Sequence, residues 1–247
     1  YEIPLRLVCS EMCIRDRLHV GHGRGAAFGD AIGKILQANG YAVSKEYYIN
    51  DAGRQMDILA ASVWLRLHNY FDDKSFPESG YKGSYIIDIA NQVDSSLKIE
   101  SSKIDNLISD LPEDPEEQID ALIKVFQQED KSLWKQIKEI SLKMVLKTIE
   151  DDLKAFKVDF DNWYYESSLG SLEDPSSKIA SAINQLKTEG LAYEENGAIW
   201  LKTEQAGDDK NRVLIRDDGR ATYFAADLAY HKDLSLIHIS EPTRRRG

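Results

Sequence analysis

The chain has 247 residues, of which 42% are hydrophobic and 30% are charged, and its formal net charge is −11 at pH 7. This composition is typical of a globular protein with a substantial core, which excludes collagen-like, low-complexity and wholly disordered chains. The excess of carboxylates argues against a non-specific nucleic-acid binder, although a local basic patch could still hold RNA.

Apolar runs and cysteines bear on location and assembly. No uninterrupted apolar run reaches the roughly 20 residues that span a bilayer. Residues 1–17 lack the basic segment followed by an apolar segment that marks a secretory signal. Cys9 and Cys13 are too few for a disulfide scaffold, and their spacing is a weak metal signal. We expect a cytoplasmic, monomeric protein with no structural metal and no membrane contact.

The two ends of the chain differ from its middle. Residues 5–17 (LRLVCSEMCIRDR) and 235–247 (SLIHISEPTRRRG) favour arginine over lysine and show no helical or strand period. Both resemble translated sequencing-adapter DNA, so we expect 1–17 and 235–247 to be artefacts outside the fold. The alternative is a genuine unusual terminus with a basic tail.

The order helix–strand–helix is predicted for the first part of the middle. An apolar stripe marks residues 22–39 as a helix that stops at Asn39-Gly40. Residues 41–49 have strand composition, and residues 55–70 return to a helical period. The stripe consists of Ala26, Ala27, Ile32, Ile35 and Leu36. This order is the repeating part of an α/β nucleotide-binding fold.

A mainly helical region is predicted next. Residues 71–81 have the composition of a connector, and the acidic, Ser-rich residues 95–117 are expected to form an exposed hairpin. The clearest helix lies within 133–156, where apolar residues recur near every 3.6 positions. They are Leu133, Ile137, Ile140, Met144, Ile149, Leu153 and Phe156.

Strands and one helix are predicted to alternate in the last part. Residues 158–165 form a strand candidate, and residues 175–189 form a short helix. Two hairpins follow, one turning at Asn196-Gly197 and one at residues 217–219, with residues 222–224 as the last strand.

The first chemistry-bearing motif is the stretch from His19 to His22, HVGH, followed by Gly23-Arg24-Gly25. Two histidines three apart at a helix start share one face, and the helix N-terminus attracts anions. Gly21 leaves room for a flat ring such as adenine. The predicted ATP site is His19, Gly21, His22 and Gly25, with His19 and His22 as catalytic stabilisers of charge on an α-phosphate. The alternatives are metal ligands or plain surface residues.

The second motif is the pair Tyr223 and Asp227. Four residues apart, they share one helical turn if a helix starts there. A ring that stacks on a cation beside a carboxylate that accepts two N–H bonds suits a guanidinium. The alternative is a core tyrosine and a helix-capping or salt-bridged aspartate.

Two blocks of the chain resemble the class I aminoacyl-tRNA synthetases, in particular the arginyl-tRNA synthetases. The first is LHVGHGRGAAFGDAIGKILQANGYAVSKEYYINDAGRQMD (18–57), in which HVGH matches the HIGH signature of the class, and the second is DDKNRVLIRDDGRATYFAADLAYHKD (208–233). The resemblance covers about residues 18–234. It implies an α/β fold, a Rossmann-like parallel sheet of an incomplete class I catalytic core, with a largely helical insertion. We expect catalytic parts at 18–75 and 158–234 and the insertion at 76–157.

The resemblance also implies an activity. The family activates arginine with ATP, accompanied by Mg²⁺, to arginyl-adenylate and then transfers arginine to tRNA(Arg). It implies that Tyr223 and Asp227 bind the arginine side chain. Further residues in the family blocks are expected in the active-site wall or in contact with tRNA. They are Asn50, Asp51, Gln55, Tyr230 and His231.

Departures from the family pattern lead to the expectation that the chain as written is inactive. The loop that precedes HVGH is replaced by residues 13–17, and the lysine-rich loop expected beyond His231 and both appended domains are absent. The principal alternative is a non-catalytic RNA- or protein-binding module on the same scaffold. A cysteine-specific ligase is a weaker alternative, because the middle of the chain lacks the cysteines that would bind zinc. A purely helical interaction protein is also weaker, because α/β blocks lie at both ends of the middle.

Overall fold

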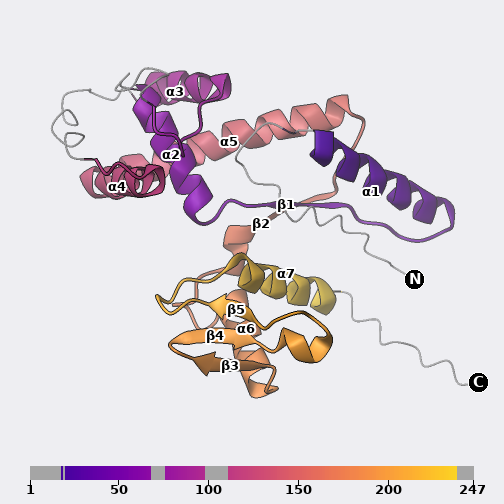
Figure 1. Ribbon diagram of the computed structural model, residues 1–247. Helices are drawn as coiled ribbons and strands as arrows, with labels where there is room; N and C mark the ends of the chain where they lie inside the picture. Colours follow the sequence, from indigo (N-terminus) through magenta and orange to yellow (C-terminus); the bar gives the residue numbers. More distant parts are fainter. Residues whose placement is uncertain (1–17, 19, 68–75, 98–110, 238–247) are drawn as a thin grey trace, which may run out of the picture.

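The computed structural model describes residues 18, 20–67, 76–97 and 111–237, and the structural statements below concern these residues. The architecture is mixed α/β, with a helical lobe and a smaller lobe on either side of a parallel strand pair (Figure 1). The elements in chain order are α1 (Val20–Ala38), β1 (Glu46–Ile49), α2 (Arg54–Leu67), α3 (Ser84–Leu97), α4 (Pro115–Glu129), α5 (Lys131–Ala155), β2 (Asn162–Tyr165), the 3-10 helix η2 (Glu166–Leu169), α6 (Lys178–Thr188), β3 (Ala192–Glu195), β4 (Ala198–Leu201), the 3-10 helix η3 (Thr203–Ala206), β5 (Arg212–Ile215) and α7 (Tyr223–Ile237).

The parallel pair β1–β2 joins segments that are far apart in the sequence. Its register runs from Glu46 opposite Asn162 to Ile49 opposite Tyr165. The pair begins where the Lys45 N–H donates to Asp161 Oδ2 at 2.7 Å, and the 161 and 162 N–H groups donate to the Lys45 carbonyl. Both strands lie within predicted strand segments, and the expected parallel sheet with a helical insertion is confirmed.

Side chains of the strand pair alternate between the two lobes, as the two-residue period of a strand requires. Tyr47 stacks on Trp163 with ring centroids 4.6 Å apart, within the core of the helical lobe. Tyr48 points the other way, toward Tyr164 and Tyr230, with ring centroids 6.0 Å and 4.6 Å away. The strand pair therefore contributes aromatic rings to both cores.

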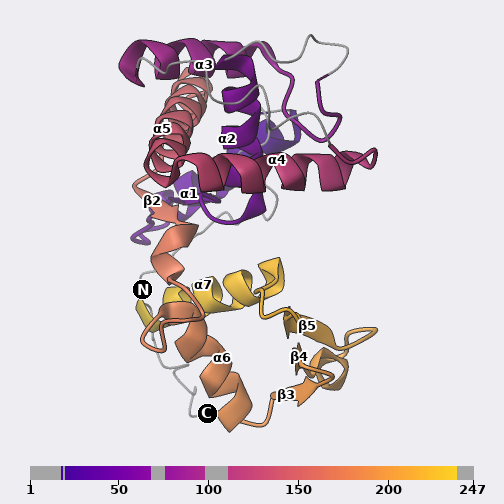
Figure 2. The ribbon, with the colours of Figure 1, turned by 90° about the vertical axis from the view of Figure 1, so that its left-hand side faces the viewer.

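The helical lobe comprises α2, α3, α4 and α5, stacked above the strand pair (Figures 1 and 2). Helix α2 runs through its middle, and every residue from Ile58 to Leu65 is buried. The Trp64 ring stacks on Phe126 of α4 at 4.9 Å. Helix α2 thus shares one core with the helices of the predicted insertion, and the boundary between residues 75 and 76 stays a prediction.

The small lobe comprises residues 166–234, with the antiparallel sheet β3–β4–β5 packed beside α6 and α7. The hairpin at Asn196-Gly197 is confirmed. The strand predicted over residues 222–224 is wrong: Ala221 forms only an isolated bridge to Ile215, and α7 begins at Tyr223. The Thr222 hydroxyl and N–H donate hydrogen bonds to carbonyls of β5. The Thr222 carbonyl accepts the Ala225 N–H, and this bond begins the helix.

Two further expectations meet the structure in the connecting segments. Residues 76–83 are irregular, as a connector should be. The hairpin expected over 95–117 is wrong at both described ends, because α3 continues to Leu97 and α4 begins at Pro115. Asp114 caps α4 by accepting the Glu116 and Glu117 N–H groups at 2.9 and 3.0 Å, with proline at the first helical position. Residues 98–110 lie outside the described part.

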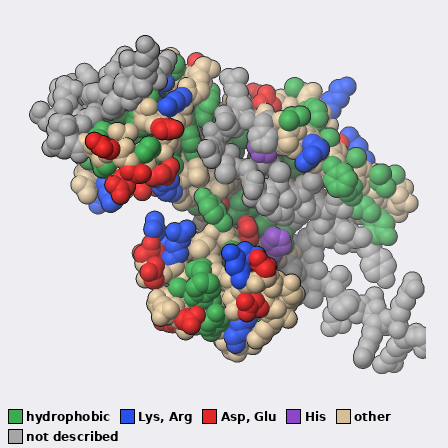
Figure 3. Space-filling model, in the orientation of Figure 1, with side chains coloured by type: hydrophobic (Ala, Val, Ile, Leu, Met, Phe, Trp, Pro, Cys, Tyr) green, Lys and Arg blue, Asp and Glu red, His purple; other side chains and the backbone are tan. Residues whose placement is uncertain are grey.

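Helix α1 shows an unexpected distribution of buried and exposed residues. The predicted helix is confirmed, but its buried residues are His22, Gly29, Asp30 and Gly33. Of the predicted apolar stripe, Ile35 is 61% exposed, and neighbouring Phe28 is 65% exposed. Figure 3 shows hydrophobic side chains gathered on this outer face of the molecule. Asp30 is held instead by Lys34 and Lys45, at 2.5 and 3.0 Å.

Within the described ranges, no helix has both the length and the apolar content that crossing a bilayer requires.

The unfolding free energy should change very differently when a buried and an exposed aliphatic side chain of similar size are each replaced by alanine. Leu59, fully buried in α2, should lose about 2–5 kcal/mol of unfolding free energy on Leu59→Ala, because a cavity is left in the core. Ile35→Ala on the exposed face of α1 is the matched control and should change it by less than about 0.5 kcal/mol. Urea unfolding of both variants measures the difference, and equal losses would contradict the packing described above.

Candidate functional site

Polar side chains gather where β1 and β2 end. Asn50 and Asp51 directly follow β1, and Glu166 directly follows β2. Because the strands are parallel and in register, their carboxyl ends lie at the same edge, the usual ligand-binding edge of an open α/β sheet. Asp51, Glu166 and Asp227 of α7 are called the acidic cluster below.

Asp51 fastens the two strand ends together. Its Oδ1 accepts the Ser167 backbone N–H at 2.8 Å, and its Oδ2 accepts the Ser167 hydroxyl at 2.6 Å. These bonds satisfy the start of η2, which would otherwise expose free N–H groups. Asp51 therefore shapes the wall of the site and fixes the position of the neighbouring Glu166.

Glu166 is the most perturbed carboxyl group of the cluster. Burial is the main cause that raises its pKa from 4.5 to about 7; the charges of Asp51 and Asp227 contribute to the rise, and the nearby Tyr48 hydroxyl opposes it. The Asn50 amide, oriented to satisfy its neighbours, donates to Glu166 Oε2 at 3.1 Å and to the Ala52 carbonyl at 3.0 Å. Glu166 is thus held in place by Asn50 while its charge is poorly solvated.

The hydroxyl of Tyr48 is a buried polar group directed into this cluster. It faces the Glu166 carboxylate closely enough for each group to shift the pKa of the other. Burial raises the pKa of Tyr48, and the nearby charges of Glu166 and Asp227 raise it further, so the phenol stays protonated. A buried donor and acceptor of this kind is expected to bind a ligand atom or water.

Helix α7 supplies the third side of the site. Tyr223 and Asp227 occupy successive turns at its start, so they share a face as expected. Tyr223 is 63% exposed, whereas burial raises the pKa of the half-buried Asp227, an effect that a charged His231 partly offsets. His231 Nδ1 lies 2.8 Å from the Asp227 carbonyl oxygen. The pair thus presents an open ring beside a desolvated carboxylate.

Tyr230 forms the floor beneath these groups. It is 2% exposed and packs between Tyr48 and Tyr164, with ring centroids 4.6 and 4.7 Å away. Its hydroxyl donates to the buried Glu46 carboxylate at 2.6 Å. Of the two roles expected for Tyr230, a place in the wall agrees with this burial, and a contact with RNA does not.

The chemistry of the site suits a flat, delocalised cation. Two partly buried carboxylates, a phenol and an amide surround it, and burial raises the pKa of both Glu166 and Asp227. Among the described residues no three His, Cys, Asp or Glu side chains come close enough together to hold a metal ion. A guanidinium spans a larger gap and offers five donors, which matches carboxylates contributed by two different segments of the chain.

Sequence reasoning missed Glu166 and Tyr48. The signal was present, because Glu166 follows the predicted strand 158–165 just as Asn50 follows the strand 41–49. The rule that parallel strands present their carboxyl ends together would have selected it. Tyr48 could not be singled out, because alternation alone does not say which strand face meets the site.

The predicted ATP residues lie on α1. Gly21, His22 and Gly25 belong to its first two turns, and His22 is 9% exposed. His19 lies outside the described residues, as do Cys9 and Cys13. A Cβ on Gly23 would lie 3.9 Å from Phe156 Cζ, the residue that directly follows α5. The role of these residues stays a prediction.

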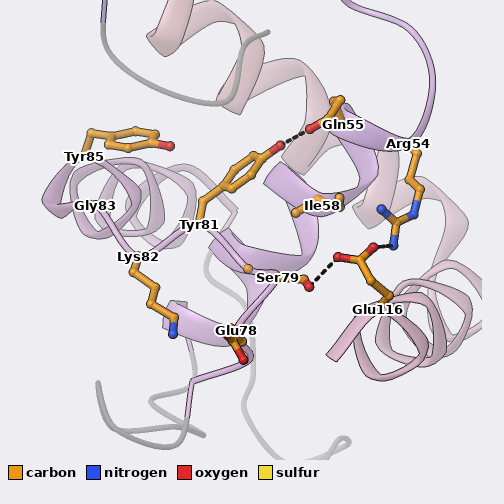
Figure 4. Close-up of a pocket in the computed structure, with 11 residues that line it drawn as sticks. Arg54, Gln55, Ile58, Glu78, Ser79, Tyr81, Lys82, Gly83, Tyr85 and Glu116 are labelled. Atoms are coloured by element: carbon orange, nitrogen blue, oxygen red, sulfur yellow. Dashed lines mark hydrogen bonds and ion pairs between the residues drawn. The ribbon is translucent and has the colours of Figure 1, made fainter. Parts of the chain in front are cut away.

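Gln55 faces a different hollow from the acidic cluster. It lines a cleft of about 500 Å³ between α2, the connector 78–83 and α4. Its side-chain oxygen accepts the Tyr81 hydroxyl, and neighbouring Arg54 pairs with Glu116 and Asp120 at 2.7 and 2.8 Å (Figure 4). Gln55 therefore lines this cleft, whereas Asn50 and Asp51, only a few residues earlier in the sequence, do not.

Comparison with known proteins gives a consistent result. Residues 9–236 match the family described as tRNA synthetases class I (R), catalytic domain. The chain is 48% identical over 223 residues to an arginine–tRNA ligase of Legionella pneumophila, a match that covers 87% of this chain and 37% of that protein. It is 44% identical over 225 residues to the arginine–tRNA ligase of Thioalkalivibrio sulfidiphilus, with 87% and 38% covered. The chain thus spans little more than a third of the length of these relatives.

Solved structures agree with the fold. A Campylobacter jejuni protein assigned as an arginyl-tRNA synthetase superposes with a TM-score of 0.65 at 31% identity, covering 95% of this chain and 44% of that one. Thermus thermophilus arginyl-tRNA synthetase superposes with a TM-score of 0.54 at 22% identity, covering 90% and 34%, which supports the fold alone.

Glu166 should make folding stability depend on pH. Its folded pKa is raised, so the unfolded state loses the proton first and the unfolding free energy falls as pH rises from about 4.5 to about 7. The unfolding free energy of Glu166→Gln should not fall in this way. Between pH 4.5 and pH 7 it should therefore rise by about 2 kcal/mol relative to that of the wild type, after allowance for solvent screening.

Urea unfolding at pH 4.5, 6 and 8 measures this dependence. Glu173→Gln, at an exposed position, is the control and should follow the wild-type profile. Parallel profiles for wild type and Glu166→Gln would show that the carboxyl group is not desolvated.

Proposed function

The chain belongs to the catalytic-domain family of the class I arginyl-tRNA synthetases, and from this premise we propose that its acidic cluster binds the guanidinium of arginine for ATP-dependent transfer to tRNA(Arg). One observation carries the proposal: Glu166 and Asp227 come together at the carboxyl ends of β1 and β2, beside the buried Tyr48 hydroxyl. Removal of one partner of such a charge pair is costly, so the carboxylates favour a cation that completes the pair.

Each group has a distinct task in this proposal. Asp227 accepts two parallel N–H bonds from the guanidinium, and the exposed Tyr223 ring stacks on its face. Glu166, which Asn50 holds in place, accepts a hydrogen bond from the guanidinium N–H groups that Asp227 does not bind. Asp51 acts as a positioning residue, because both of its oxygens are engaged by Ser167. Tyr230 and His231 support the α7 side of the pocket.

ATP is proposed to bind at the start of α1. His19, Gly21, His22 and Gly25 form the candidate site, where the positive end of the helix dipole and the imidazoles attract the triphosphate. Mg²⁺ would arrive on the phosphates as part of the substrate, since Mg²⁺ is commonly held through substrate oxygens, and it would neutralise charge leaving with pyrophosphate. The histidines would stabilise the α-phosphate as its charge grows.

The reaction follows from these placements. An arginine carboxylate oxygen forms a bond to the α-phosphorus of ATP, and the bond to pyrophosphate breaks. A ribose hydroxyl of the terminal adenosine of tRNA(Arg) then attacks the activated carbonyl, and AMP leaves. The protein contributes orientation and charge stabilisation, without a covalent enzyme intermediate.

Other aspects of the function rest on the sequence. The division into catalytic parts at 18–75 and 158–234 with an insertion at 76–157, the cytoplasmic location and the monomeric state stay predictions. The alternative of a non-catalytic binding module is less well supported, because it gives no reason for desolvated carboxylates to gather without a cation.

Arginine should stabilise the folded chain through Asp227. At 100 times its dissociation constant, arginine should add about 2.7 kcal/mol, seen as a rise of several degrees in Tm. Citrulline has the same shape without the charge and should give almost no shift. Asp227→Asn should weaken arginine binding by about 10- to 100-fold, because a charge-assisted bidentate pair is lost.

Thermal unfolding with and without each amino acid measures these shifts. Asp88→Asn, exposed on α3, is the matched control and should keep the full arginine response. Equal responses to arginine and citrulline would overturn the proposed guanidinium site.

A further inference from the structure

Helix α7, which carries Tyr223 and Asp227, lies beside the strand pair (Figure 1) and meets it through a buried carboxylate that the proposed reaction does not use. We propose that Glu46 is a positioning residue for arginine binding, because through Tyr230 it fixes α7, and with it Asp227, against β1 and β2. The inference rests on the proposed function for the identity of the ligand. Glu46 begins β1 and is therefore at the opposite end of this strand from the acidic cluster.

Both oxygens of Glu46 are engaged, each by a different element. Glu46 is 3% exposed and lies opposite Asn162, the first residue of β2. Its Oε2 accepts the Asn162 side-chain amide, and its Oε1 accepts the Tyr230 hydroxyl at 2.6 Å. Burial of a carboxylate is costly unless such bonds are made. Glu46 therefore joins β1, β2 and α7 at one point.

The residues of α7 that face the strands form one stripe. Tyr223, Asp227 and Tyr230 are spaced four and three apart, so they share one face of the helix. On β1, Glu46 and Tyr48 share the face that looks toward α7, because side chains alternate along a strand. Tyr230 contacts both, and Asp227 lies close enough to Tyr48 for its charge to act on the phenol. The stripe therefore runs along β1 from Glu46 toward the acidic cluster.

The bond to Glu46 supplies direction in an interface made largely of aromatic rings. Ring contacts are satisfied over a range of angles and separations, whereas a hydrogen bond weakens steeply as its angle falls. A second polar anchor of α7, Asp233, pairs with Lys178, whose side chain is 46% exposed, and exposed pairs contribute little. Asp233 is also six residues from Asp227, whereas Tyr230 is three. The position of Asp227 therefore depends most on the bond between Tyr230 and Glu46.

Small movements of α7 would matter because two segments of the chain share the arginine site. Glu166 follows β2, whereas Asp227 belongs to α7. A guanidinium bound by both needs a fixed separation between them, and two parallel N–H bonds to one carboxylate demand a defined orientation. Misplacement by about 1 Å can cost an active site about 100-fold in rate. Glu46 thus acts on arginine through Tyr230, without touching the ligand.

Arginine affinities of variants that preserve packing test the inference. Tyr230→Phe removes only the hydroxyl and should raise the arginine dissociation constant by about 10-fold, the lower end of what a hydrogen bond to a charged group contributes. Glu46→Met keeps the side-chain volume without the carboxylate and should have the same effect. Glu46→Gln keeps an oxygen that can accept the Tyr230 hydroxyl and should stay within about twofold of wild type.

Isothermal titration calorimetry of the full chain with arginine, below the temperature at which any variant unfolds, measures these constants. Citrulline is the uncharged comparison ligand. Tyr193→Phe is the matched control, because it removes another tyrosine hydroxyl of the small lobe, one that accepts an N–H of the Asn211 amide at 3.3 Å. Its arginine affinity should equal that of the wild type.

A double variant separates positioning from support of the fold. Glu46→Met combined with Tyr230→Phe replaces both partners by apolar groups of similar shape, a change that is often nearly neutral for stability. Urea unfolding without arginine should therefore give a midpoint close to that of the wild type. The arginine dissociation constant should nevertheless stay about 10-fold raised, no more than in either single variant, because both changes break the same bond.

The outcomes distinguish this inference from the proposed function. If Tyr230→Phe and Glu46→Met bind arginine as the wild type does, or if affinity returns together with stability in the double variant, Glu46 only supports the fold. The inference is then overturned and the arginine site stands. A Glu46→Gln variant as weak as Glu46→Met would overturn it as well. If the wild type itself does not bind arginine, the proposed function fails, and this inference fails with it.

Discussion

The pairing of β1 with β2 is the constraint on which the rest of the structure depends. Four residues of each strand bring together segments that the whole helical lobe separates in the sequence. Strand alternation then directs Tyr47 into one core and Tyr48 into the other. Because the pairing is parallel and in register, Asn50 and Glu166 emerge side by side at one edge. Both the union of the lobes and the candidate site follow from this one register.

Poorly solvated carboxyl groups lie at the carboxyl ends of β1 and β2. Among the other described carboxylates, several meet cations or helix N-termini, as Asp30 meets Lys34 and Lys45. Glu166 and Asp227 are instead held in a half-buried space, where desolvation raises the pKa of each. Such an arrangement is unfavourable in the absence of a cation and favourable with one. Poor solvation of these carboxylates is the physical reason for proposing that a guanidinium binds there.

Sequence reasoning succeeded where a single physical signal dominated. The long period of α5 and the Asn196-Gly197 turn were predicted because local propensity and packing agree there. On α1 the apolar period was misleading, because the buried side of the helix is made of Gly29, Gly33 and the ion-paired Asp30, which carry no apolar signal. Residues 222–224 have strand composition, yet the carbonyls of β5 bind Thr222 and leave the chain to begin a helix. Glu166 could have been selected because it follows the predicted strand 158–165, but its place beside Asn50 depends on the strand register, which no local pattern contains.

The bond from Tyr230 to Glu46 joins residues 184 positions apart, and this separation has a consequence for synthesis. All the helices of the helical lobe have been made once residue 155 has been translated, and the contacts among them are comparatively local. The face of β1 that carries Tyr48 stays uncovered until α7 has been translated, because the rings that cover it belong to β2 and α7. Folding of this protein on the ribosome is thus expected to proceed in two stages, with the ligand pocket closing last. During the interval between the stages, the nascent chain exposes an unpaired strand edge that chaperones would need to shield.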